Sequence, residues 1–177
     1  MNITSKELKR MGFDDIAPIR RSKMGNTPTV YDGVQYKSKL EARFACMLDH
    51  WVHFGVISEW QYEPESMIFP WKDKHGKAKD IEYIPDFRVV HTAPAEVWYY
   101  ETKGQIQQYD LTKWELFKEH RTESLCIVFA AKLKIGQGRR GNISTWKHGK
   151  MKRVVDRIWE NVNQEFKKRT YNMGDLI

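Results

Sequence analysis

The centre of the chain holds two segments rich in β-branched and aromatic residues, with only four residues between them. Residues 81–91 (IEYIPDFRVVH) and 96–103 (EVWYYETK) flank the turn-like sequence Thr-Ala-Pro-Ala at 92–95. Such compositions are typical of strands, and so short a connection favours an antiparallel hairpin. This hairpin constrains the fold most, because its two strands must pair and bury their apolar faces.

A helix is predicted to begin at Ser38, an N-cap residue, and to end near Gly55. Its apolar side chains recur at helical spacing on one face: Leu40, Phe44, Met47, Leu48 and Trp51. Before it, the Asp-Gly pair at 32–33 is a hairpin-turn signal between short strands.

The segments after this helix predict further strands and a loop. Residues 56–70 are expected to be extended and broken at Pro64, and the polar stretch 72–80 to form a loop. In the second half, Asp110 is expected to cap a helix that ends at His120. A continuous apolar run at 125–130 is typical of a buried strand.

The C-terminal third predicts a glycine-rich basic loop followed by one long helix. Gly136, Gly138 and Gly141 mark the loop. From Met151 to about Arg169, apolar residues form an amphipathic stripe: Val154, Val155, Ile158, Trp159, Val162 and Phe166.

This order of elements indicates an α/β fold with a central mixed sheet flanked by helices. We divide the chain into an N-terminal helix and irregular arm (1–30), a core (31–131) and a basic loop with the C-terminal helix packed on that core (132–177). The N-terminal helix rests on a capping box, Thr4-x-x-Glu7. Cys46 and Cys126 lie in apolar surroundings without a CxxC or Cys/His cluster, which favours buried free thiols over a zinc site.

The positive charge is concentrated in one segment. The net charge is +7, and residues 124–155 contain no Asp or Glu but eight of the 30 basic residues, leaving 22 against 23 acidic ones elsewhere. The eight are Lys132, Lys134, Arg139, Arg140, Lys147, Lys150, Lys152 and Arg153. A localised basic surface is typical of a polyanion-binding protein, although a solvated basic loop has the same composition.

Three charged residues are expected to converge on the predicted hairpin. Glu101 and Lys103 are two residues apart, so they project from the same face of a strand. If the hairpin forms, Asp86 lies beside Glu101 at the strand ends. Carboxylate oxygens are the ligands that Mg²⁺ prefers, and a lysine beside them suits phosphodiester hydrolysis.

Each of these residues also has a purely structural interpretation. Ser38-x-x-Glu41 is a capping box, in which Glu41 returns to the helix N-terminus. The dipeptide Pro-Asp at 85–86 is common in turns, and Glu101 with Lys103 is compatible with an exposed strand edge. Trp146 is expected to pack in the core rather than to stack on a base.

Several motifs together resemble the PD-(D/E)xK nuclease superfamily over roughly residues 30 to 130. The matching positions are Ser38-x-x-Glu41-Ala42-Arg43, Trp60-x-Tyr62-Glu63-Pro64, Tyr83-x-Pro85-Asp86-Phe87, Glu101-x-Lys103-Gly104 and Lys113. The resemblance is greatest to phage endonuclease I, a Holliday-junction resolvase type, and to related phage-encoded and transposon-end nucleases. It implies a restriction-endonuclease-like core.

By this resemblance, Glu41 is the helical acid, Asp86 and Glu101 are the metal-binding pair, and Lys103 is the catalytic lysine. The implied metal is Mg²⁺, for which Mn²⁺ is expected to substitute, and no small-molecule cofactor is expected. Resolvases generally act as symmetric dimers, so a homodimer is compatible with the resemblance, although nothing in the sequence itself indicates one.

The expected function is therefore a Mg²⁺-dependent DNA endonuclease, acting on branched DNA or as a nicking or degrading phage nuclease. Phosphate contacts are expected from the basic residues Lys113, Lys132, Lys134, Arg139, Arg140, Lys147 and Lys150. No apolar run is long enough to span a membrane, so we expect a cytoplasmic protein, of a bacterial host cell if phage-encoded. The alternative is a non-catalytic nucleic-acid-binding or regulatory protein that retains a nuclease fold.

Overall fold

A five-stranded mixed sheet forms the centre of the protein. The computed structural model describes residues 27–73, 75–136 and 143–168. Antiparallel pairs join the first three strands, and parallel pairs join the last three. In spatial order the strands are β3 (Ile57–Tyr62), β6 (Phe87–His91), β7 (Val97–Lys103), β8 (Ser124–Phe129) and β9 (Arg157–Trp159).

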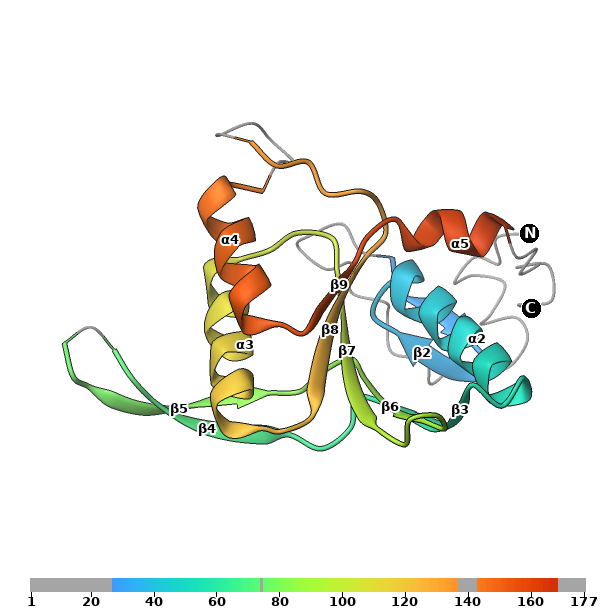
Figure 1. Ribbon diagram of the computed structural model, residues 1–177, viewed down its shortest axis with the longest axis horizontal. Helices are drawn as coiled ribbons and strands as arrows, with labels where there is room; N and C mark the ends of the chain where they lie inside the picture. The colour runs from blue at the N-terminus through green and yellow to red at the C-terminus, as the bar shows by residue number, and fades with distance from the viewer. Residues whose placement is uncertain (1–26, 74, 137–142, 169–177) are drawn as a thin grey trace, which may run out of the picture.

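Helices cover both faces of this sheet, as Figure 1 shows, with α2 and α5 on one face and α3 and α4 on the other. The described helices are α2 (Lys39–His53), α3 (Gln108–His120), α4 (Thr145–Val154) and α5 (Val162–Lys168). The predicted α/β class with a mixed central sheet is confirmed. Within the described part of the chain, no helix is long and apolar enough to cross a membrane.

The two faces of the sheet bury separate cores because neighbouring strand residues point to opposite sides. Tyr99 packs with α3 and α4 in what we call the α3-side core, whereas Tyr100 packs with α2 and α5 in the α2-side core. Cys46 and Cys126 are buried free thiols, as predicted. The site residues of β7 are divided between the two faces by the same alternation.

The predicted helix after Ser38 is confirmed as α2. The Ser38 side chain caps it by accepting a hydrogen bond from the Glu41 backbone N–H at 3.2 Å. Gly55 follows the helix with a positive φ of 66°, a conformation that glycine adopts without strain. The apolar face of α2 buries Phe44 and Leu48 completely.

The predicted Asp-Gly hairpin is confirmed as β1 (Thr29–Tyr31) and β2 (Val34–Tyr36). Asp32 and Gly33 both have positive φ, at 46° and 73°, as a tight two-residue turn requires. The expected N-terminal helix and most of the irregular arm lie outside the described residues.

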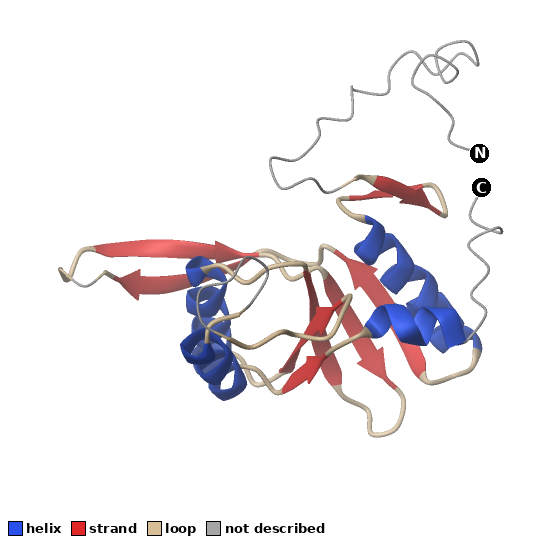
Figure 2. Ribbon diagram, turned by 90° about the horizontal axis from the view of Figure 1, so that it is seen from above, coloured by secondary structure: helices blue, strands red, loops and turns tan. Residues whose placement is uncertain are grey.

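Residues 66–86 depart from the prediction, because the stretch 81–91 is not one strand and 72–80 is not a loop. β5 (Ala78–Tyr83) pairs with β4 (Met67–Lys72) in a separate two-stranded ribbon, so strand residues occupy much of the predicted loop. The chain then bends through Pro85 and Asp86 into β6. We call this β4–β5 hairpin the arm, since Figure 2 shows it projecting from the body of the protein.

The prediction of one long C-terminal helix from Met151 to about Arg169 is also wrong. The segment forms α4, then β9, then α5, so the central sheet extends beyond residue 131. Asp156 ends the first helix by pairing with Leu125 of β8: its backbone N–H donates to the Leu125 carbonyl at 3.0 Å, and its carboxylate accepts from the Leu125 N–H at 2.9 Å. β9 thereby covers the free edge of β8.

Candidate active site

The predicted carboxylate pair meets where β6 begins and β7 ends. Phe87 is paired with Tyr100 across the antiparallel ladder, so Asp86, one residue earlier, lies across from Glu101. The bend at Pro85 leaves Asp86 at the end of the ladder rather than inside it. The structure therefore brings these two predicted site residues together.

Thr102, for which the sequence predicted no role, holds the Asp86 carboxylate. The Thr102 backbone N–H and its hydroxyl each donate to the same oxygen, Asp86 Oδ2, at 2.7 Å. Because neighbouring strand residues point to opposite faces, the Thr102 side chain points away from Glu101 and Lys103. Its hydroxyl fixes the position of Asp86 instead.

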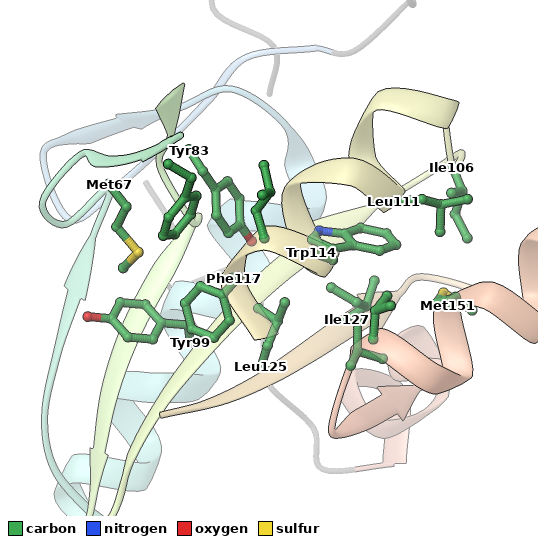
Figure 3. Close-up of a cluster of buried hydrophobic side chains, with 14 of the residues drawn as sticks. Met67, Tyr83, Tyr99, Ile106, Leu111, Trp114, Phe117, Leu125, Ile127 and Met151 are labelled. Atoms are coloured by element: carbon green, nitrogen blue, oxygen red, sulfur yellow. The ribbon is translucent and has the colours of Figure 1, made fainter. Parts of the chain in front are cut away.

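Glu101 and Lys103 project together on the α3 side of β7, as predicted. Glu101 is only 6% exposed, so the alternative of an exposed strand edge is wrong. Its Oε1 lies 2.7 Å from Lys103 Nζ, and its Oε2 accepts a hydrogen bond from the Tyr83 hydroxyl at 3.2 Å. Figure 3 shows Tyr83 with Trp114 and other buried side chains between α3 and the sheet.

Asp110 also belongs to this cluster, although the sequence predicted only that it caps a helix. The N-cap of α3 is Gln107, and Asp110 is the third residue of the first turn. One Asp110 oxygen accepts the Gln107 backbone N–H at 2.7 Å, while the other lies 3.1 Å from Lys103 Nζ. Lys103 is thus held between two carboxylates.

Glu41 lies on the opposite, α2 side of the sheet, and its carboxylate is bound at the N-terminus of α2 by the Ser38 hydroxyl and the Lys37 backbone N–H. It is 6% exposed. Its Oε1 accepts from the Ser38 hydroxyl at 2.7 Å, and its Oε2 accepts from the Tyr62 hydroxyl at 2.6 Å and from the Lys37 backbone N–H at 3.1 Å. A helix cap alone does not require the tyrosine.

Burial and like charges shift the protonation equilibria of these groups. Burial raises the pKa of Asp86 well above its ordinary value, and the charges of Glu101 and Glu41 add to this, against the opposing hydrogen bonds from Thr102. Burial also raises the pKa of Glu101, although Lys103 opposes that rise. Asp86 is therefore the carboxylate whose pKa is raised by the charges of both other acids, Glu101 and Glu41.

Lys103 shows the complementary shift. Burial lowers the pKa of Lys103, but the carboxylates of Glu101 and Asp110 outweigh burial and raise it above the ordinary lysine value. The side chain is consequently an ammonium ion at neutral pH in this arrangement.

The three acids do not form one compact ligand group. Asp86 lies between Glu41 on the α2 side and Glu101 on the α3 side, and among the described residues no three His, Cys, Asp or Glu side chains are grouped closely enough to hold a metal ion. Asp86 and Glu101, two carboxylates whose pKa values are raised, fit a hard divalent cation that would relieve their repulsion.

Two neighbouring depressions open beside these residues. One, of about 820 Å³, is lined by Lys103, Lys132, Lys134 and Lys147. The other, of about 310 Å³, is lined by Glu41 and Thr102. Gly104 and Ala130 line both, so the basic depression adjoins the one that contains Glu41.

The other predicted phosphate contacts are less available. Lys150 Nζ lies 2.7 Å from Glu115, and Lys113 lies over the rings of Tyr83 and Tyr109, 5.6 and 5.0 Å from their centroids. Arg139 and Arg140 lie outside the described residues.

The expectation that Trp146 packs in the core is wrong. Its side chain is 56% exposed in the first turn of α4, one residue before Lys147 of the basic depression. Residue 146 lies on the solvent-facing side of the first turn of α4, so the Trp146 side chain is not buried as most tryptophans are.

A comparison with models of protein families identifies the family of this chain. A family model, described as "Protein of unknown function (DUF1064)", matches residues 21–135. The chain belongs to the DUF1064 family. The span shared with DUF1064 contains Glu41, Asp86, Glu101 and Lys103 and ends before α4. A comparison with curated proteins returned no match.

Proposed function

We propose that the protein is a Mg²⁺-dependent DNA endonuclease that hydrolyses phosphodiester bonds. The observation that carries the proposal is the placement of Asp86 across from Glu101, next to the ammonium of Lys103, which is itself one of four lysines that line a depression. Acidic residues for a metal and basic residues for a polyanion thus adjoin each other, and few functions other than phosphate chemistry use both.

Asp86 and Glu101 would hold the metal, with Glu41 contacting it directly or through water. Mg²⁺ keeps several of its waters and uses only one or two carboxylates, so a site with two adjacent acids and a third nearby fits it. When bound, the metal polarises the phosphoryl group and lowers the pKa of a coordinated water. Mn²⁺, with the same preference for oxygen ligands, is expected to substitute.

The chain's own residues supply positioning and charge. Thr102 fixes the orientation of Asp86 through two hydrogen bonds, and Tyr83 fixes Glu101. Because Lys103 is protonated, it fits the stabilisation of negative charge that develops on the phosphate better than proton abstraction from water. Asp110 holds the Lys103 ammonium close to the reacting group.

The basic depression supports a nucleic acid as substrate. Lys132, Lys134 and Lys147 provide charges that contact phosphates without reading sequence. By the resemblance described above, branched DNA of the Holliday-junction kind is one candidate substrate, and nicking or degradation of other DNA would need the same chemistry. That resemblance is also compatible with a homodimer, and we further propose a cytoplasmic location.

A cleavage panel tests the proposal. Four-way junction, flap, single-stranded, nicked and linear duplex DNA, with RNA counterparts, are incubated with Mg²⁺, Mn²⁺ or EDTA. We expect metal-dependent cleavage that falls by at least about 100-fold in Glu101→Gln and Lys103→Met, as loss of a group acting on developing charge does. Glu59→Gln, an exposed carboxylate on β3 paired with Arg88, is the matched control and should cleave normally.

Absence of metal-dependent cleavage on every substrate would overturn the proposal, as would full activity of Glu101→Gln. In that event, salt-sensitive binding that is indifferent to metal would identify the alternative, a non-catalytic nucleic-acid-binding protein.

A further inference from the structure

The arm brings together a second group of positive charges, apart from residues 124–155. Lys72 ends β4, Lys77 lies in the turn, and Lys79 lies in β5. The turn and the register of the ladder place all three at the tip of the projecting hairpin (Figures 1 and 2). In the sequence these three lysines are separate positions in the polar stretch 72–80, which predicts a loop.

The tip is ordered by its own acidic residue. Asp73 Oδ1 accepts the backbone N–H groups of His75 and Lys77 at 2.8 and 2.9 Å. The Asp73 carboxylate therefore closes the turn, and it forms no ion pair with a lysine of the described ranges. Lys79 lies over the Trp71 ring on the paired strand, 4.9 Å from its centroid, which fixes its stem against the ribbon.

The three lysines are exposed cations. All three side chains are exposed, and none forms an ion pair with another residue of the described ranges. Asp80, across from Pro70, and Glu119 of α3 line a depression together with Lys72 and Lys79, and neither carboxylate forms an ion pair with these lysines in the described part of the chain. A projecting two-stranded ribbon has the width that fits along a DNA groove.

The root of the arm is part of the candidate active site. Tyr83, the last residue of β5, donates its hydroxyl to Glu101, and Asp86 follows three residues later. β5 has six residues, so at about 3.3 Å per residue the tip lies about 20 Å from the root. That span corresponds to about six base pairs of duplex DNA at 3.4 Å each.

We infer that the arm is a second phosphate-binding surface, which contacts duplex DNA about six base pairs from the bond that is cut. Lys72, Lys77 and Lys79 contact the backbone and read no sequence. The inference rests on the proposed function for the position of the cut, but the contact itself is a matter of binding. It limits the substrate class to DNA with a duplex segment long enough to reach the tip.

Binding without metal tests the inference. Affinities for a 24-base-pair and an 8-base-pair duplex are measured by fluorescence anisotropy in EDTA, between about 50 and 200 mM salt. Each phosphate contact contributes about 0.9 to the slope of log K against log salt, so the triple variant Lys72→Gln/Lys77→Gln/Lys79→Gln should lower the slope by about 2.7 on the long duplex. On the short duplex, which ends about four base pairs from its centre, the slope should stay unchanged.

Matched variants separate local contact from net charge and from folding. Lys118→Gln removes one charge from α3, where Lys118 is already paired with Asp156, and should leave the slope unchanged. The double variant Lys72→Gln/Lys77→Gln spares the Lys79–Trp71 contact and should still lower the slope by about 1.8.

An unchanged slope on the long duplex, or an equal loss on both duplexes, would overturn the inference. So would a change in the sedimentation coefficient of the triple variant, which would identify the arm as a contact between copies of the chain. Cleavage of a junction by the same variants is measured separately. Metal-dependent cleavage with an unchanged slope rejects the arm contact alone, whereas absent cleavage rejects the proposed function.

Discussion

Replacing Asp86 by Asn should make the protein more stable and inactive at the same time. Asp86 is half-buried beside two other acids, and its pKa is raised by burial and by Glu101 and Glu41, so its ionised form is unfavourable. Asn has nearly the same shape and can still accept both hydrogen bonds from Thr102. The substitution therefore removes the unfavourable charge and keeps the contacts.

The pH dependence fixes the sign of this effect. In the unfolded chain Asp has a pKa of about 3.9, and in the native state the pKa of Asp86 is higher. Between these values the native state binds more protons than the unfolded state, so the free energy of unfolding falls as pH rises through this window. The cost is absent below pH 4 and complete above the native pKa.

The magnitude follows from the same linkage. Each pKa unit of elevation corresponds to about 1.4 kcal/mol, and leaving a buried polar group poorly compensated typically costs about 1 to 3 kcal/mol. We expect Asp86→Asn to gain about 1 to 3 kcal/mol at pH 7.5 without metal. For a chain of this length that raises Tm by about 2 to 12 °C.

Calorimetry in EDTA at pH 4 and pH 7.5, followed by Mg²⁺ addition, measures the effect. The two proteins should be similar at pH 4 and differ at pH 7.5. Mg²⁺ should stabilise the wild type, by about 2.7 kcal/mol at 100 times the dissociation constant, and leave the variant unchanged. Asp32→Asn, at an exposed turn position with φ of 46°, is the control and should shift stability by less than about 0.5 kcal/mol.

A variant less stable than the wild type at both pH values would refute the reasoning. It would mean that the Thr102 hydrogen bonds outweigh burial and repulsion, and that Asp86 serves the fold rather than a metal.

Four further predictions concern the helix cap, the core, the site and the basic depression. Ser38→Ala removes the cap of α2 and should cost about 0.5 to 2 kcal/mol in urea unfolding, and an unchanged midpoint would contradict the cap. Phe44→Ala empties a fully buried site in the α2-side core and should cost about 3 to 5 kcal/mol; a loss below 1 kcal/mol would show that the core relaxes around it. Gly104→Ala places a methyl group in open space where both depressions meet, so stability should hold while single-turnover cleavage falls. Lys132→Gln should lower the salt slope of DNA binding by about 0.9, whereas Lys150→Gln, whose charge is engaged by Glu115, should lower it less; equal effects would discount that pairing.

Features that depend on neighbours in sequence were determined by the sequence alone. Ser38 caps α2 because its hydroxyl reaches an N–H three residues ahead. The Asp-Gly turn forms because both residues tolerate positive φ. Glu101 and Lys103 share a face because the period of a strand is two.

Features that depend on which edges and faces remain uncovered were decided only by the tertiary structure. The apolar stripe from Val154 to Phe166 satisfies helical spacing, yet it is divided between the two cores. The free edge of β8 has unpaired backbone groups that β9 satisfies, and Asp156 secures that pairing. The separation of β5 from β6 likewise depends on β4, which pairs with β5 outside the central sheet.

The candidate site divides in the same way. Strand period and hairpin register, both local, bring Asp86, Glu101 and Lys103 together. Packing across the two faces of the sheet decides that Asp110 of α3 reaches Lys103 and that Glu41 approaches Asp86 from the opposite side. Each of those interactions is between a helix and a strand or the bend beside it, and no periodicity in the sequence encodes the distance between separate elements.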